Sequence, residues 1–145
     1  MGYGMLVAGL IGWAVAGLLK YPIHSVTHKK WDWMLFFSTG GMPSSHSSFV
    51  SATALAVGLF SGFDTPAFAV AFTLAAVVIY DAAGVRRQAG MHAERINMII
   101  DEMFKGHPIT EDDLKEVLGH TPFEVLAGMA CGWLCALVTW LLWPK

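Results

Sequence analysis

The chain has 145 residues, of which 55% are hydrophobic and only 14% are charged. A soluble domain usually carries about a quarter charged residues, so this composition argues against one. It also excludes a disordered chain, which has few apolar and many charged residues. The net charge of −2 offers no basic surface for nucleic acid. The length predicts one domain over residues 1–145.

Four long segments of the chain lack charged residues. A helix needs about 20 apolar residues to cross a bilayer, and Met1–Leu19 and Val125–Trp143 have that length. Ser47–Phe63 and Pro66–Tyr80 are shorter, but each reaches a span when its polar end residues are included. We therefore predict an all-α integral membrane protein with about four transmembrane helices.

The basic residues lie mainly in two of the connecting segments. With four spans, the segment after the first helix and the segment after the third helix lie on the same side of the membrane. That side holds eight of the nine basic residues: Lys20, Lys29, Lys30, Arg86, Arg87, Arg95, Lys105 and Lys115. Basic loops stay in the cytoplasm, so we predict a cell inner-membrane protein with this face on the cytoplasmic side.

The segment Gln88–Gly119 is the polar part of the chain. Apolar residues recur there at helical spacing from Ile96 to Phe104, with charged residues between them. A second short helix is predicted from Thr110, which opens a capping-box pattern, to about Leu118. Residues 88–119 are therefore predicted to form a cytosolic helical insertion.

Polar residues gather where the predicted spans meet this cytoplasmic face. Ser44, Ser45 and His46 precede the second span, where a helix N-terminus and hydroxyl groups can bind phosphate. His120 and Glu124 open the fourth span and are four residues apart, so the carboxylate can orient the imidazole. Two arginines follow the third span and a lysine ends the first: Arg86, Arg87 and Lys20. Such a set suits phosphoryl transfer without a metal, because cations and backbone donors hold the phosphate while histidines act as nucleophile and acid.

These motifs resemble a known superfamily. Pro43-Ser44-Ser45-His46 is similar to the P-S-G-H motif of the type-2 phosphatidic-acid phosphatase and vanadium haloperoxidase superfamily. The stretch His120–Gly128 is similar to its H-x-P-x-D-V-x-A-G motif. The runs G-G-M-P-S-S-H-S and D-x-x-G-V-R-R resemble its divergent branch. The resemblance extends from Lys20 to Gly132.

The resemblance implies a role for each matching residue. His120 matches the nucleophilic histidine, Glu124 replaces the aspartate that orients it, and His46 matches the general acid. The implied phosphate-binding residues are Ser44, Ser45, Arg86, Arg87 and Lys20, with Lys30 as the second candidate for the superfamily's lysine. The superfamily core has six helices, so the roughly four spans of this chain imply a homodimer.

A second histidine competes with His120. Arg86 and His92 have the superfamily's R-x5-H spacing, but Ile96 stands where His92 would need an acid. His120 has the acid, the proline and a membrane helix behind it, so we expect His120 to be the nucleophile. The polar segment Gln88–Gly119 must then return the chain to the site.

The sequence therefore predicts a metal-independent membrane phosphatase that hydrolyses a lipid phosphate or pyrophosphate through a phosphohistidine, without a cofactor. Its partners would be the lipid substrate and the bilayer. The alternative is a non-enzymatic membrane scaffold or small transporter with an anion-binding pocket. A third reading is a metal carrier, because His24, His28 and Asp32 recur every four residues.

Overall fold

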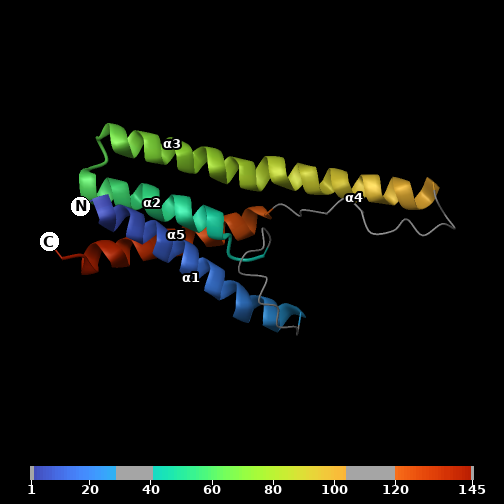
Figure 1. Ribbon diagram of the computed structural model, residues 1–145, viewed down its shortest axis with the longest axis horizontal. Coiled ribbons are helices and arrows are strands. Elements are labelled where there is room, and N and C mark those ends of the chain that lie inside the picture. The colour runs from blue at the N-terminus through green and yellow to red at the C-terminus, as the bar shows by residue number, and fades with distance from the viewer. Residues whose placement is uncertain (1, 29–40, 104–119, 145) are drawn as a thin grey trace.

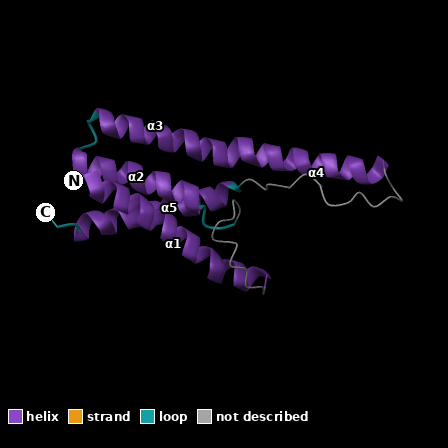
Figure 2. Ribbon diagram, in the orientation of Figure 1, coloured by secondary structure: helices purple, strands orange, loops and turns teal. Residues whose placement is uncertain are grey.

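The computed structural model describes residues 2–28, 41–103 and 120–144. They form the helices α1 (Gly2–His28), α2 (Ser45–Ser61), α3 (Pro66–Tyr80), α4 (Arg86–Met103) and α5 (Pro122–Leu142), with a π-helical turn η2 (Asp81–Val85) between α3 and α4. Figure 2 shows only helices and short loops in the described part of the chain. The predicted all-α fold class is confirmed.

Side-chain caps fix the first residues of three helices. Ser44, Thr65 and Thr121 each accept a hydrogen bond from a backbone N–H in the first turn of α2, α3 and α5. These bonds satisfy donors that have no partner within a helix. Pro66 and Pro122 stand at the start of α3 and α5, where a missing N–H does no harm.

The helices form a bundle around α2, in which α1 and α3 run antiparallel to α2 and α5 runs parallel to it (Figure 1). Helix α2 packs against α1, α3 and α5, and α1 also packs against α5 (Figure 1). Helix α3 lies on the outside of α2, and its other face exposes apolar side chains such as Val70, Leu74 and Val77. An apolar outer surface of this kind suits a protein surrounded by lipid.

Small residues allow the central helices to approach closely. A Cβ atom added at Gly128 would meet the backbone carbonyl oxygen of Ser44, and one added at Gly132 would meet that of Ser48. Helix α1 approaches the same stretch of α2, because a Cβ atom added at Gly12 would lie 3.0 Å from the Ala52 side chain. Close backbone approach through small residues is the usual basis of helix packing in membranes.

Three helical segments among the described residues are long and apolar enough to cross a membrane: Gly2–Ile23, Pro66–Ile100 and Pro122–Leu142. The fourth predicted span is α2, which has 17 residues and is about 25 Å long at 1.5 Å per residue. That is slightly less than a hydrocarbon core of about 30 Å. Its place at the centre of the bundle means that protein, rather than lipid, covers much of its surface.

The third predicted span continues beyond its expected end. Helix α3 ends at Tyr80, but η2 and α4 carry the helix on to Met103 (Figure 1). The predicted helix near Ile96 is therefore the distal part of α4, and it extends from the bundle rather than beginning after a break. The short helix predicted from Thr110 to Leu118 falls outside the described residues.

Candidate active site

The up-and-down course of the chain brings polar residues from three helices together. Lys20 lies within α1, eight residues before the helix ends at His28, Ser44 precedes α2, and His120 precedes α5. All three are buried, with relative exposures of 1%, 0% and 4%. His46, in the first turn of α2, is exposed. Polar residues that are far apart in the sequence therefore meet at one end of an apolar bundle.

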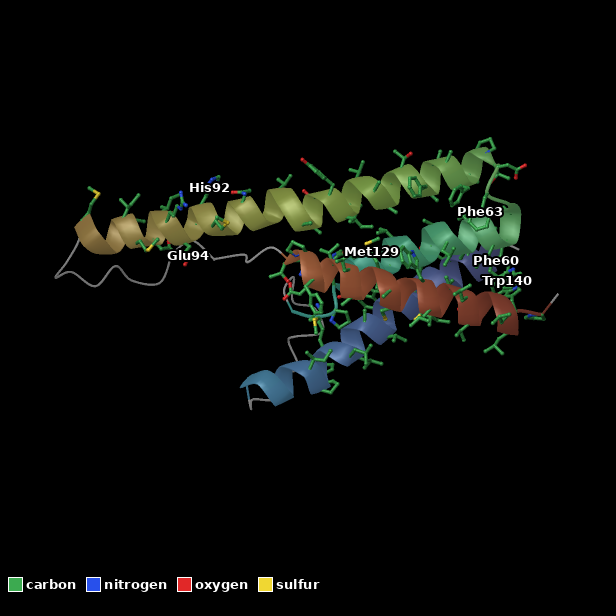
Figure 3. All side chains as sticks on the ribbon, turned by 180° about the vertical axis from the view of Figure 1, so that it is seen from behind. Phe60, Phe63, His92, Glu94, Met129 and Trp140 are labelled. Carbon is green, nitrogen blue, oxygen red and sulfur yellow. The ribbon has the colours of Figure 1, made fainter. Side chains whose placement is uncertain are left out.

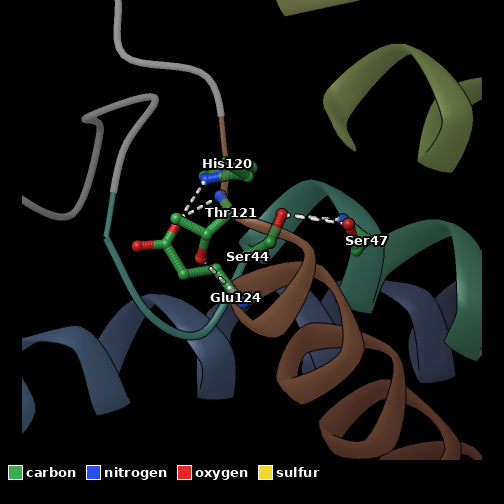
Figure 4. Close-up of polar contacts among 5 residues, drawn as sticks. All are labelled: Ser44, Ser47, His120, Thr121 and Glu124. Atoms are coloured by element: carbon green, nitrogen blue, oxygen red, sulfur yellow. Dashed lines mark hydrogen bonds and ion pairs between the residues drawn. The ribbon is translucent and has the colours of Figure 1, made fainter. Parts of the chain in front are cut away.

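The start of α2 is joined to the start of α5 by backbone and side-chain hydrogen bonds. The Ser44 N–H donates to the Glu124 carbonyl oxygen over 3.1 Å. The Ser44 hydroxyl oxygen accepts from the N–H and the hydroxyl of Ser47, over 3.3 Å and 3.0 Å (Figure 4). These bonds hold the serine motif and the His120 segment in a fixed relative position.

Glu124 has two structural roles at the start of α5. Its Oε2 accepts a hydrogen bond from the Thr121 N–H over 2.9 Å, while its own N–H donates to the Thr121 hydroxyl oxygen over 3.3 Å. This reciprocal pair is a capping box. The same Oε2 lies 3.4 Å from Nδ1 of His120 (Figure 4). The capping box thus fixes the carboxylate that faces the imidazole.

The buried environment of His120 favours the neutral form of its imidazole. Burial lowers the pKa of His120 below its ordinary value, and the facing Glu124 carboxylate opposes that effect. The positive charges of Lys20 and His46 lower the pKa of His120 further. Lys20 also interacts electrostatically with Glu124. A neutral imidazole with Nδ1 facing a carboxylate keeps the lone pair of Nε2 available as a nucleophile.

Of the other predicted phosphate ligands, the structure describes the side chain of Ser45 only. Ser45 is buried in the first turn of α2, where helix N–H groups favour an anion. Arg86 and Arg87 begin α4, directly after η2, which contacts α5; their side chains lie outside the description. Lys30 falls in the undescribed residues 29–40.

His92 does not join this group. Its side chain is exposed on α4, which extends away from the bundle (Figure 3). The pocket that it borders is formed by α3, η2 and α4 alone. Six residues of helix turn through about 600°, so Arg86 and His92 lie on different faces of α4, and His92 is not grouped with His120 and Glu124.

Within the described ranges, no three His, Cys, Asp or Glu side chains are grouped as metal ligands. The side chains of His24 and His28 lie outside the description, as does Asp32. The metal-carrier hypothesis therefore concerns side chains that the structure does not describe.

Sequence reasoning missed two contributors to the site. Ser47 supplies a hydroxyl and an N–H to Ser44, and Thr121 forms the capping box with Glu124. The Thr-x-x-Glu pattern before an apolar run was the available signal for the second. Ser47 carried no such signal, because the inward direction of a hydroxyl depends on how α2 is rotated in the bundle.

Comparison with known proteins adds independent information. The model of a protein family described as the Divergent PAP2 family matches residues 2–135. The chain is 40% identical over 144 residues to the "Uncharacterized membrane protein YuiD" of Bacillus subtilis (strain 168), covering 92% of this chain and 91% of that protein. No solved structure matches the chain.

Proposed function

The chain belongs to the Divergent PAP2 family, and we propose that it is a metal-independent membrane phosphatase acting on a lipid phosphate or pyrophosphate. The observation that carries this proposal is the buried His120 facing the Glu124 carboxylate, with the charges of Lys20 and His46 acting on the same imidazole. Two histidines and a cation at the end of a membrane bundle suit transfer of a phosphoryl group from a lipid headgroup.

In the proposed reaction, Nε2 of His120 attacks phosphorus and the bond from phosphorus to the leaving oxygen breaks. His46 donates a proton to that oxygen, and its exposed position allows the proton to be replaced from water. Water then attacks the phosphohistidine, the bond from Nε2 to phosphorus breaks, and phosphate leaves. Glu124 stabilises the positive charge that develops on the imidazole.

Cations and helix N–H groups would hold the phosphoryl oxygens. Lys20 is the best-placed cation, because its charge acts on both Glu124 and His120. Ser44, Ser45 and the N-terminus of α2 would supply neutral donors. Arg86, Arg87 and Lys30 complete the proposed set.

The proposal is tested by phosphate release from purified protein in nanodiscs. The substrates are phosphatidate, phosphatidylglycerol phosphate and a prenyl pyrophosphate, each with EDTA present. The proposal would be supported if the wild-type protein released phosphate from at least one of these substrates, if His120→Ala released none, and if His92→Ala still released it. If the wild-type protein released no phosphate from any of them, the non-enzymatic anion-binding reading would be preferred.

A further inference from the structure

An apolar groove of about 610 Å³ lies between α2, α3 and α5. It extends along α3 from Phe68 to Tyr80 and on to Ala83 in η2, and Met129 of α5 forms part of its wall (Figure 3). The sixteen residues of helix from Phe68 to Ala83 extend over about 22 Å, which exceeds one leaflet of a core about 30 Å thick. The groove is therefore long enough for an extended hydrocarbon chain.

One polar side chain lines this groove. Ser51 of α2 is 3% exposed, and its hydroxyl oxygen has no hydrogen-bond partner among the described residues. A buried hydroxyl without a partner costs about 1–3 kcal/mol. Its position in the lining suggests that the missing partner belongs to whatever occupies the groove.

Other hydroxyl groups in the helices find partners in the protein. Thr53, Thr73 and Thr139 each donate to the carbonyl oxygen four residues earlier, over 2.9, 2.8 and 2.7 Å. The Ser48 hydroxyl donates to the Gly12 carbonyl oxygen over 2.8 Å. Bonding to the preceding turn is the ordinary solution for serine and threonine in a membrane helix. Ser51 differs from these four because no such bond forms.

The position of Ser51 indicates the kind of partner. It is seven residues beyond Ser44, two turns or about 10 Å deeper along α2. The N–H groups at the start of α2 point away from Ser51 along the helix axis, so only the hydrogen bond of about 3 Å at Ser51 shortens this distance. A phosphoryl oxygen held at the start of α2 and an acceptor bonded to Ser51 are therefore about 7–10 Å apart. In an acylated glycerol phosphate, the ester carbonyls lie a few bonds from the phosphate, in that interval. A prenyl phosphate has no polar atom there.

We propose that the groove between α2, α3 and α5 binds a chain of an acylated glycerol phosphate and that the Ser51 hydroxyl donates a hydrogen bond to its ester carbonyl. The inference rests on the proposed function for the position of the phosphate. It makes Ser51 a specificity residue that distinguishes ester-linked lipids from ether-linked and prenyl lipids.

The experiment compares diacyl glycerol phosphate with a dialkyl ether analogue of equal chain length. A neutral hydrogen bond contributes about 0.5–1.5 kcal/mol, so the wild-type kcat/KM should favour the ester by about twofold to thirteenfold. Ser51→Ala should reduce that ratio to about one. Thr73→Ala is the matched control, because Thr73 bonds to its own helix and does not line the groove; it should keep the wild-type ratio.

A binding assay separates this inference from the proposed function. The affinities for non-hydrolysable phosphonates of the ester lipid and the ether lipid are measured, and their ratio is compared between wild type and Ser51→Ala. This ratio can be measured even if the protein has no phosphatase activity. If Ser51→Ala does not fold, Ser51→Cys, with its weaker donor, should give an intermediate ratio. Equal affinity of the wild-type protein for ester and ether phosphonates would overturn the proposal. Efficient disulfide formation between copies of an Ala76→Cys variant lacking Cys131 and Cys135 would also overturn it, because a second chain would then fill the groove.

Discussion

The substitution Glu124→Gln separates the two roles of the residue that joins the capping box to His120. Glutamine can still accept the bond from the Thr121 N–H, because capping boxes accept either side chain. The cap should therefore persist, and the free energy of unfolding should fall by about 0.3–1 kcal/mol, the usual contribution of a carboxylate at a helix N-terminus. What disappears is the negative charge that faces Nδ1 of His120.

The distance sets the size of the expected loss. Two charges 3.4 Å apart interact by at most about 5 kcal/mol at an effective dielectric constant of about 20. The Glu124 side chain is 22% exposed, so water screens part of this energy. If about half acts on the developing imidazolium charge, kcat should fall by about 100-fold.

The pH profile identifies the electrostatic origin of that loss. Neutral His120 is the nucleophile, so activity should fall as pH drops through the pKa of His120, which lies below the ordinary histidine value. The Glu124 charge raises that pKa, and its removal should move the acidic limb of kcat/KM to lower pH. The measurement is phosphate release at constant ionic strength over the acidic range.

Thr121→Val is the control, because it breaks the cap without changing a charge. It should destabilise the protein by about 1 kcal/mol and leave the acidic limb in place. An acidic limb that moved to higher pH in Glu124→Gln, or wild-type kcat in that variant, would refute the proposed role of the carboxylate.

Three further predictions concern the chemistry and the packing. His120→Ala and His46→Ala should each abolish turnover, whereas His92→Ala should keep most of it. An active His120→Ala variant together with an inactive His92→Ala variant would identify His92 as the nucleophile. Orthovanadate should inhibit as a mimic of the phosphoryl transition state and EDTA should not, and activity lost to EDTA but restored by a divalent ion would indicate a metal site. Gly132→Ala should lower stability by about 1–3 kcal/mol because the added methyl group meets a backbone carbonyl, whereas Gly84→Ala, which has nothing within 4 Å, should not; thermal unfolding in detergent compares them.

The sequence was sufficient to predict that the site residues converge. Alternation of apolar and polar segments reverses the chain at each membrane face, so Lys20, His46 and His120 fall at the same end whatever the details of packing. The i, i+4 spacing likewise predicted that Glu124 faces His120. Both inferences depend on helical periodicity and on the bilayer, which act locally along the chain.

Features that depend on helix rotation could not be predicted in this way. Gly84 and Arg86 are residues typical of a helix C-terminus, yet the helix continues through η2 into α4. The five buried serines at the start of α2 and within it look alike in sequence: Ser44, Ser45, Ser47, Ser48 and Ser51. The Ser44 cap is a local bond to Ser47, but the packing against α1, α3 and α5 decides which hydroxyl bonds to a neighbouring helix and which is left without a partner.

The last prediction concerns which side of the membrane holds the site. Eight of the nine basic residues belong to segments at the site end, and basic segments are retained in the cytoplasm. Glu94 is exposed on α4 and lies about 42 Å along the helix from Pro66, beyond a core of about 30 Å. Asp64 is exposed in the turn at the opposite end.

Single cysteines at these two positions test the orientation. In a variant lacking Cys131 and Cys135, Asp64→Cys should react with an impermeant thiol reagent on intact cells. Glu94→Cys should react only after the cells are permeabilised. The site would then act on lipid phosphates of the inner leaflet, because His120 and Lys20 lie at the same end of the bundle as the start of α4. Labelling of Glu94→Cys on intact cells, with Asp64→Cys protected, would place the site outside and would exclude an inner-leaflet substrate.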